Sequence, residues 1–132
     1  MNDCGALPDA WPDISLNDFQ QLIEIIPELK IMTISPHLES KCDYNRLKLL
    51  LDNNIKPSLG HDKVATEMEI ISALRLSPSC PLNVTHCFNV STFHHRNPSL
   101  VNFGLMSRFP NLPQYQGVVP PTVEVIADMA HV

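Results

Sequence analysis

Apolar residues recur along the chain either at helical spacing or in short continuous runs typical of buried strands. The first helical pattern begins at Ser15, which is suited to cap a helix, and ends at Pro27. Its apolar positions are Leu16, Phe19, Leu22, Ile23 and Ile26. The same spacing predicts further helices over residues 43–53, 63–76 and 99–106. Apolar runs predict strands over residues 29–35, 55–59, 82–85 and 122–127.

Helices and strands alternate with short linkers, which is typical of a parallel sheet covered by helices. About four strands in 132 residues is half of what a (β/α)8 barrel contains, since such a barrel needs roughly 250 residues. We therefore expect an α/β fold, a partial (β/α)8 TIM-barrel of about four βα units over residues 15–132. Residues 1–14 lack periodicity and are expected to form an irregular N-terminal segment.

Composition narrows the classes of partner. Apolar residues make up 44% of the chain and charged residues 17%, which is typical of a globular domain. The net charge of −5, from 14 acidic and 9 basic residues, and the lack of a basic run argue against nucleic acid. No apolar stretch approaches the length of a membrane span, and the N-terminus has no signal-peptide pattern. A cytoplasmic location and four reduced cysteines, none in a Cys-x-x-Cys pair, are the expectation.

Two histidines come directly after predicted strands. His61 follows the run 55–59, and His86 follows the run 82–85. In parallel α/β folds, ligands and metals collect where the strands end, so two imidazoles on neighbouring strands could bind one divalent ion. The alternative is that each histidine is simply hydrogen-bonded at the start of a loop. Spacing alone leaves both interpretations open, because metal sites with distant ligands have no strict pattern.

The residues around these histidines carry a resemblance to a known family. Ser58-Leu-Gly-His61, followed by Ala65-Thr66, resembles the Gly-His-Ser-x-Ala-Thr motif of N-acetylglucosamine-6-phosphate deacetylases. Thr85-His86-Cys-Phe-Asn89 resembles the Thr-His-Leu-Phe-Asn-Ala-Met motif of the same family. Three more segments, at residues 32–36, 93–101 and 126–131, resemble its other motifs in the same order. The family belongs to the amidohydrolase superfamily of (β/α)8 barrels.

The resemblance implies roles for six residues. It makes His61 and His86 ligands of a catalytic divalent metal (Zn, Fe, Co or similar), and it gives contacts with an amino-sugar phosphate to Asn89, the backbone at Val90, Arg96 and His131. In the family, the arginine typically reaches the phosphate across a homodimer interface. The implied reaction is metal-dependent hydrolysis of the acetamide of an N-acetyl amino-sugar phosphate to acetate and amino-sugar phosphate.

Several departures from the family motifs lie near the implied ligands. Asp62 stands in place of the motif serine, Val90-Ser91 in place of Ala-Met, Met129 in place of a glycine, and His37 in place of a glutamate. The family's glutamate metal ligand lies in an upstream segment that this chain lacks, and its catalytic aspartate lies beyond residue 132. We therefore expect no catalytic residue within the chain. A truncated or degenerate non-catalytic fragment that at most binds metal or sugar phosphate, and another hydrolase of the same superfamily, remain alternatives.

Other polar residues have simpler interpretations. Glu39 is expected at the start of a helix rather than at a metal. Asp62 is either a hydrogen-bond partner of His61 or the N-cap of the helix predicted from residue 63, and the cap is favoured. Cys87 is expected to be a small buried apolar residue, because it points away from His86 on the strand. His94 and His95 are expected to be solvated loop histidines.

Overall fold

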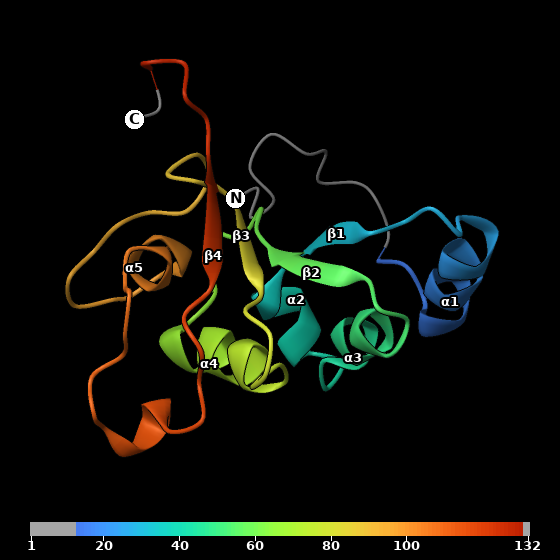
Figure 1. Ribbon diagram of the computed structural model, residues 1–132, viewed down its shortest axis with the longest axis horizontal. Coiled ribbons are helices and arrows are strands. Elements are labelled where there is room, and N and C mark those ends of the chain that lie inside the picture. The colour runs from blue at the N-terminus through green and yellow to red at the C-terminus, as the bar shows by residue number, and fades with distance from the viewer. Residues whose placement is uncertain (1–12, 131–132) are drawn as a thin grey trace.

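The chain folds into a four-stranded sheet, and helices connect successive strands along the sequence (Figure 1). The computed structural model describes residues 13–130. The elements, in chain order, are α1 (Leu16–Ile25), β1 (Ile31–Ile34), α2 (Pro36–Ser40), α3 (Asn45–Asp52), β2 (Lys56–Leu59), α4 (Glu67–Arg75), β3 (Asn83–Cys87), α5 (Leu100–Gly104), the 3-10 helix η1 (Pro113–Tyr115) and β4 (Thr122–Val125).

The sheet is entirely parallel, and its strands are ordered β1-β2-β3-β4 as in the sequence. Thr33 is in register with Ser58, Ser58 with Asn83, and Asn83 with Thr122. Each crossover between neighbouring strands contains at least one helix, as parallel pairing requires. The predicted α/β fold with a parallel helix-covered sheet is thereby confirmed.

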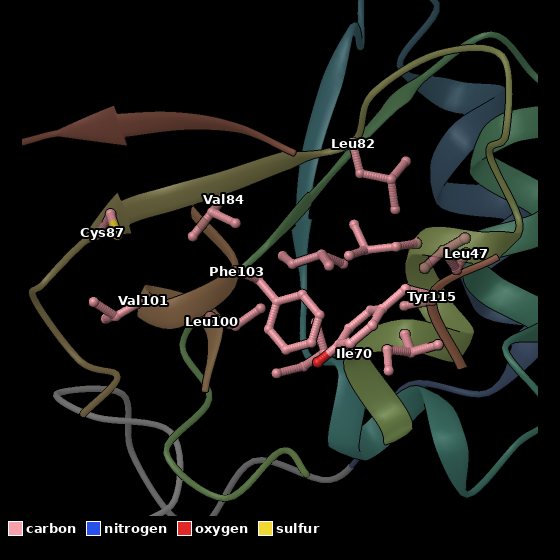
Figure 2. Close-up of a cluster of buried hydrophobic side chains, with 13 residues drawn as sticks. Leu47, Ile70, Leu82, Val84, Cys87, Leu100, Val101, Phe103 and Tyr115 are labelled. Atoms are coloured by element: carbon pink, nitrogen blue, oxygen red, sulfur yellow. The ribbon is translucent and has the colours of Figure 1, made fainter. Parts of the chain in front are cut away.

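One face of the sheet is covered by helices and holds the main core. Figure 1 shows α2, α3 and α4 gathered on the same side of the strands. Leu59 of β2 and Val84 of β3 are almost fully buried, and Figure 2 shows Val84 and Leu82 directed toward the aromatic rings of Phe103 and Tyr115. A smaller cluster, formed by Phe19, Ile23, Leu50 and Ile55, packs α1 against α3 and the start of β2.

Most predicted elements are present with ends shifted by a few residues. Ser15 caps α1 as expected, since its Oγ accepts a hydrogen bond from the N–H of Asp18 at 3.1 Å. Two elements, α2 and η1, were not predicted because five and three residues are too few to show helical periodicity. The predicted irregular segment 1–14 lies outside the described residues except for its last two.

The helix predicted over residues 63–76 begins later, and the prediction that Asp62 caps it is wrong. The N-cap is Thr66, whose Oγ1 accepts from the N–H of Glu69 while the Glu69 carboxylate accepts from the N–H of Thr66. This reciprocal pair is a capping box, which satisfies two backbone donors at the helix start. Asp62 instead accepts from the N–H groups of Val64 and Ala65, so the chain is still turning before the helix begins.

None of the helices within residues 13–130 has the length and apolar character needed to cross a lipid bilayer.

Candidate metal site

His61 and His86, the histidine pair, meet at the carboxyl edge of the sheet. His61 lies two residues beyond β2, and His86 is the fourth residue of β3, the next strand in the sheet. Their Nε2 atoms are 2.9 Å apart, and the rings meet edge to face with centroids 4.6 Å apart. The structure thus brings together two side chains that are 25 residues apart in the sequence.

The distance between these two nitrogens fits a shared divalent ion. Two imidazole nitrogens bound about 2.0–2.1 Å from one ion lie about 2.8–3.4 Å apart for ligand angles between about 90° and 109°. The same distance suits a hydrogen bond in which one neutral ring donates and the other accepts. Within residues 13–130, no cluster of three or more His, Cys, Asp or Glu side chains is placed to bind a metal.

Both histidines have an unusual backbone conformation. The φ angle is +50° at His61 and +28° at His86, and Phe88 follows at +74°. Residues other than glycine rarely adopt positive φ, and each one that does raises the free energy of the folded state by of order 1–3 kcal/mol. Strained residues of this kind cluster at binding and catalytic sites. The positive φ at each histidine occurs near the end of its strand, where the two imidazoles contact each other.

Glycine at position 60 allows the two strand ends to approach closely. A Cβ added to Gly60 would lie 2.7 Å from Cβ of Thr85, which immediately precedes His86, and 3.3 Å from Cγ2 of Thr33. Contacts under 3.0 Å between carbon atoms are not tolerated in folded proteins, so any larger residue would push β2 and β3 apart. The spacing of the histidine pair therefore depends on this glycine.

A hydrogen-bonded row of polar side chains lies on the sheet face opposite the main core. Thr85 Oγ1 lies 3.0 Å from Thr33 Oγ1 and 2.5 Å from Ser58 Oγ. Asn83 Nδ2 donates to Ser58 Oγ at 2.8 Å and to the Glu124 carboxylate at 2.6 Å. The row crosses all four strands, and its member Thr85 immediately precedes His86. Sequence analysis missed it, although the alternation of polar with apolar residues in the strands was a signal.

Asn89, Val90 and Arg96 lie in the loop that follows β3. The N–H of Asn89 donates to the carbonyl of His86 at 3.0 Å, which closes a turn directly after the histidine. Arg96 is exposed and borders a cavity of about 430 Å³ together with Lys63, Thr66 and Glu67 at the start of α4. The histidine pair does not line this cavity. His131 lies outside the described residues.

Glu39 is turned away from the histidine pair into the helical layer. It is fully buried, and its carboxylate accepts from Arg46 Nε at 2.7 Å and from the N–H of Leu47 at 3.0 Å. Leu47 lies in the first turn of α3, so Glu39 satisfies the start of that helix. This agrees with the expectation of a helix-start acid.

The remaining candidates have structural roles. Cys87 is buried as expected, and burial raises the pKa of its thiol above the ordinary range. A Cβ on Gly104 of α5 would lie 3.3 Å from its Sγ, so the thiol packs against that helix. His94 and His95 are exposed as expected, and their rings stack with centroids 4.8 Å apart. His94 Nδ1 accepts from the N–H groups of Arg96 and Asn97, which orders the loop locally.

Comparison with known proteins adds no assignment, since neither a family model nor a curated protein matches this sequence.

Proposed function

We propose that this chain supplies the two-histidine part of the metal site of an amidohydrolase-type deacetylase. Its substrate would be an N-acetyl amino-sugar phosphate, of which N-acetylglucosamine 6-phosphate is the example the sequence motifs favour. The observation that carries the proposal is the 2.9 Å between Nε2 of His61 and Nε2 of His86 at the carboxyl edge of a parallel sheet. Consecutive parallel strands with helices on one face also suit one part of a (β/α)8 barrel, the finer fold that we propose.

The histidine pair would hold the ion through neutral imidazole nitrogens. When bound there, a divalent ion would polarise an amide carbonyl and lower the pKa of a bound water. Hydrolysis breaks the amide C–N bond, so the acetyl carbon gains a hydroxyl and the sugar nitrogen gains a proton. The positive φ at both histidines supports a binding role, because residues in this conformation cluster at such sites, although Asp43, Tyr44 and Asn54 also adopt it elsewhere in the chain.

The loop after β3 would bind the phosphate end of the substrate. Arg96 and Lys63 are both cationic and border the same cavity. A guanidinium forks onto two phosphate oxygens, whereas an ammonium acts as a point charge. We propose that Asn89, the backbone at Val90 and Arg96 contact the sugar phosphate. The histidine pair does not line this cavity. We therefore propose that Arg96 binds the phosphate in the site of a second subunit of a homodimer.

A second candidate function is binding without catalysis. The observation that favours it is that the described residues hold no third metal-binding side chain beside the histidine pair. Two imidazoles completed by water would bind a divalent ion weakly. Amide hydrolysis also requires a group that moves a proton, which the histidine pair alone would not supply. In this case the chain binds metal or sugar phosphate and releases no acetate.

Cobalt titration tests the site directly. The purified chain is dialysed against a chelator and titrated with Co²⁺ while its visible absorption is recorded. We expect one Co²⁺ per chain for the wild type and loss of the signal in His61→Ala and His86→Ala. The matched control is the double variant His94→Ala/His95→Ala, which removes two neighbouring histidines from an exposed loop and should bind as the wild type does.

The outcomes separate the two functions. Acetate release from N-acetylglucosamine 6-phosphate by the cobalt-loaded chain, lost in His61→Ala, supports the deacetylase. Stoichiometric cobalt binding without acetate release supports the binder. If the wild type and both single variants bind the same amount of cobalt, the histidine pair is not a metal site and the proposal fails.

A further inference from the structure

Asp62, the residue after His61, links three segments at the carboxyl edge of the sheet through hydrogen bonds. It is only 3% exposed. One carboxylate oxygen, Oδ2, accepts from Ser35 Oγ at 2.7 Å and from the N–H of His37 at 2.9 Å. The other, Oδ1, accepts from the N–H groups of Val64 at 3.0 Å and Ala65 at 2.7 Å. Four donors therefore satisfy this buried carboxylate, and they come from the start of α2 just after β1 and from the loop before α4.

The backbone of Asp62 makes the third connection. Its carbonyl accepts a hydrogen bond from Ser91 Oγ at 2.7 Å, and Ser91 lies in the loop that begins after His86. Asp62 thus bonds the loops after β1, β2 and β3 to one another. His61 lies in the loop after β2, and His86 lies one residue before the end of β3, where the next loop starts. A shift of Asp62 would therefore move both imidazoles relative to each other.

The strained backbone beside Asp62 needs such bonds. His61 has a φ of +50°, a conformation that relaxes unless the surrounding structure holds it. Both neighbours of His61 are held in place. Gly60 packs closely against Thr85, and the Asp62 carboxylate accepts several hydrogen bonds. Hydrogen bonds to a buried carboxylate contribute more than neutral ones, because the acceptor is charged. The cluster at Asp62 can therefore offset the cost of the left-handed residue.

Two residues of this cluster are among those in which the chain departs from the motifs it resembles. Asp62 and Ser91 replace a serine and a methionine. The Ser91 hydroxyl donates to the Asp62 carbonyl, so these two departures are joined by a hydrogen bond. His37 contributes only its backbone N–H, which any residue except proline supplies.

We infer that Asp62 is the positioning residue of the histidine pair and holds the two Nε2 atoms at binding distance by joining the three loops. This inference rests on the proposed metal site. It assigns no contact between the Asp62 side chain and the ion, so Asp62 acts only through the backbone of its neighbours.

Asp62→Asn tests the inference. The amide keeps the shape of the side chain, but it turns one acceptor oxygen into a donor that faces N–H groups. We expect Asp62→Asn to bind Co²⁺ about ten- to a hundredfold more weakly than the wild type while its circular dichroism stays native. We also expect changed NMR shifts for the imidazole signals of both His61 and His86 in the metal-free protein. Ser91→Ala, which removes only the link between the loops, should change the His86 signals and weaken cobalt binding less.

The control is Glu39→Gln, which alters another buried carboxylate that satisfies a helix start but lies in the helical layer. It should lower the unfolding midpoint without changing cobalt affinity or the imidazole shifts. Unchanged affinity and unchanged imidazole shifts in both Asp62→Asn and Ser91→Ala would overturn the inference. If Asp62→Asn does not fold, Ser91→Ala decides it. If the wild type binds no cobalt, the proposed function fails, and the imidazole shifts alone decide whether Asp62 positions the pair.

Discussion

Gly60 and Thr85 face each other across neighbouring strands with no room for even one more carbon atom between them. A Cβ at position 60 would lie 2.7 Å from the Thr85 Cβ and 3.1 Å from its Oγ1. The nearest atoms belong to a short β-branched side chain in mid-strand, which cannot swing away. The residue after each of these two is a member of the histidine pair, so the contact sets how closely the imidazoles approach.

Gly60→Ala is accordingly expected to separate the ends of β2 and β3. We expect it to lower the free energy of unfolding by about 1–3 kcal/mol, as overpacking does. Cobalt binding should be lost in the folded variant. Gly117→Ala is the control, because Gly117 has a φ of +73° with no atom within 4 Å of the added carbon. It should cost stability through backbone strain alone and leave cobalt binding intact. Equal cobalt affinity in both variants would contradict the role given to Gly60.

The left-handed backbone at His61 predicts an unusual order of stability among substitutions. In that conformation glycine carries no Cβ penalty, so His61→Gly should be more stable than His61→Ala by about 1 kcal/mol. Both variants should lose cobalt binding. Urea unfolding of the metal-free proteins measures the difference. At Met68, an exposed position inside α4, the order should reverse, because glycine costs about 1 kcal/mol relative to alanine in a helix.

The buried ion pair between Glu39 and Arg46 should respond differently to single and double substitution. Arg46 is only 6% exposed and its Nε lies 2.7 Å from Glu39 Oε1, while Nη1 also bonds Asp13. Although burial opposes the charge, hydrogen bonding to Asp13 and the charge of Glu39 raise the pKa of Arg46 further above its ordinary value. Removing one partner leaves a buried charge unpaired, so Arg46→Met should cost about 3–5 kcal/mol.

The double variant Glu39→Leu/Arg46→Met should recover most of that loss, since no uncompensated charge remains. Chemical denaturation of the wild type, both single variants and the double variant gives the coupling energy between the two residues. Additive effects of the two substitutions would show that the pair is not coupled as the structure indicates.

Glu69 gives the stability of the protein a dependence on acid pH. Partial burial opposes ionisation, but hydrogen bonds from the Thr66 backbone, the Ser40 hydroxyl and the Thr66 hydroxyl outweigh it and lower the pKa of Glu69 below 4.5. A lowered folded-state pKa contributes stability that is fully present above about 4.5 and is lost as the pH falls through the folded-state value. The free energy difference between wild type and Glu69→Gln should therefore be largest near neutral pH and shrink below pH 4.5.

Thermal unfolding from pH 7 to pH 3 measures this difference. Glu24→Gln is the control, because Glu24 is exposed and its carboxylate accepts from Gln20 one turn away within α1. A gap between wild type and Glu69→Gln that stays constant with pH would show that the Glu69 hydrogen bonds do not depend on its charge.

The alternating order of helices and strands could be predicted from the sequence, because helical and strand periodicities are local properties. Ser15 as a helix cap and the four apolar runs were recognisable without tertiary structure. The helix predicted from residue 63 failed at its start for a local reason as well. Asp62 accepts from the N–H groups of Val64 and Ala65, and the capping box between Thr66 and Glu69 then sets the helix start.

The prediction that His61 and His86 occupy neighbouring strand ends also came from the sequence alone, as did the motifs that suggest an amino-sugar phosphate. Only the tertiary structure decided that their Nε2 atoms meet at 2.9 Å, that Gly60 must be small, and that Asp62 joins three loops. The reason is physical: these relationships connect residues 25 to 29 positions apart. Such distances depend on strand register and backbone direction, and neither leaves a periodic trace in the sequence.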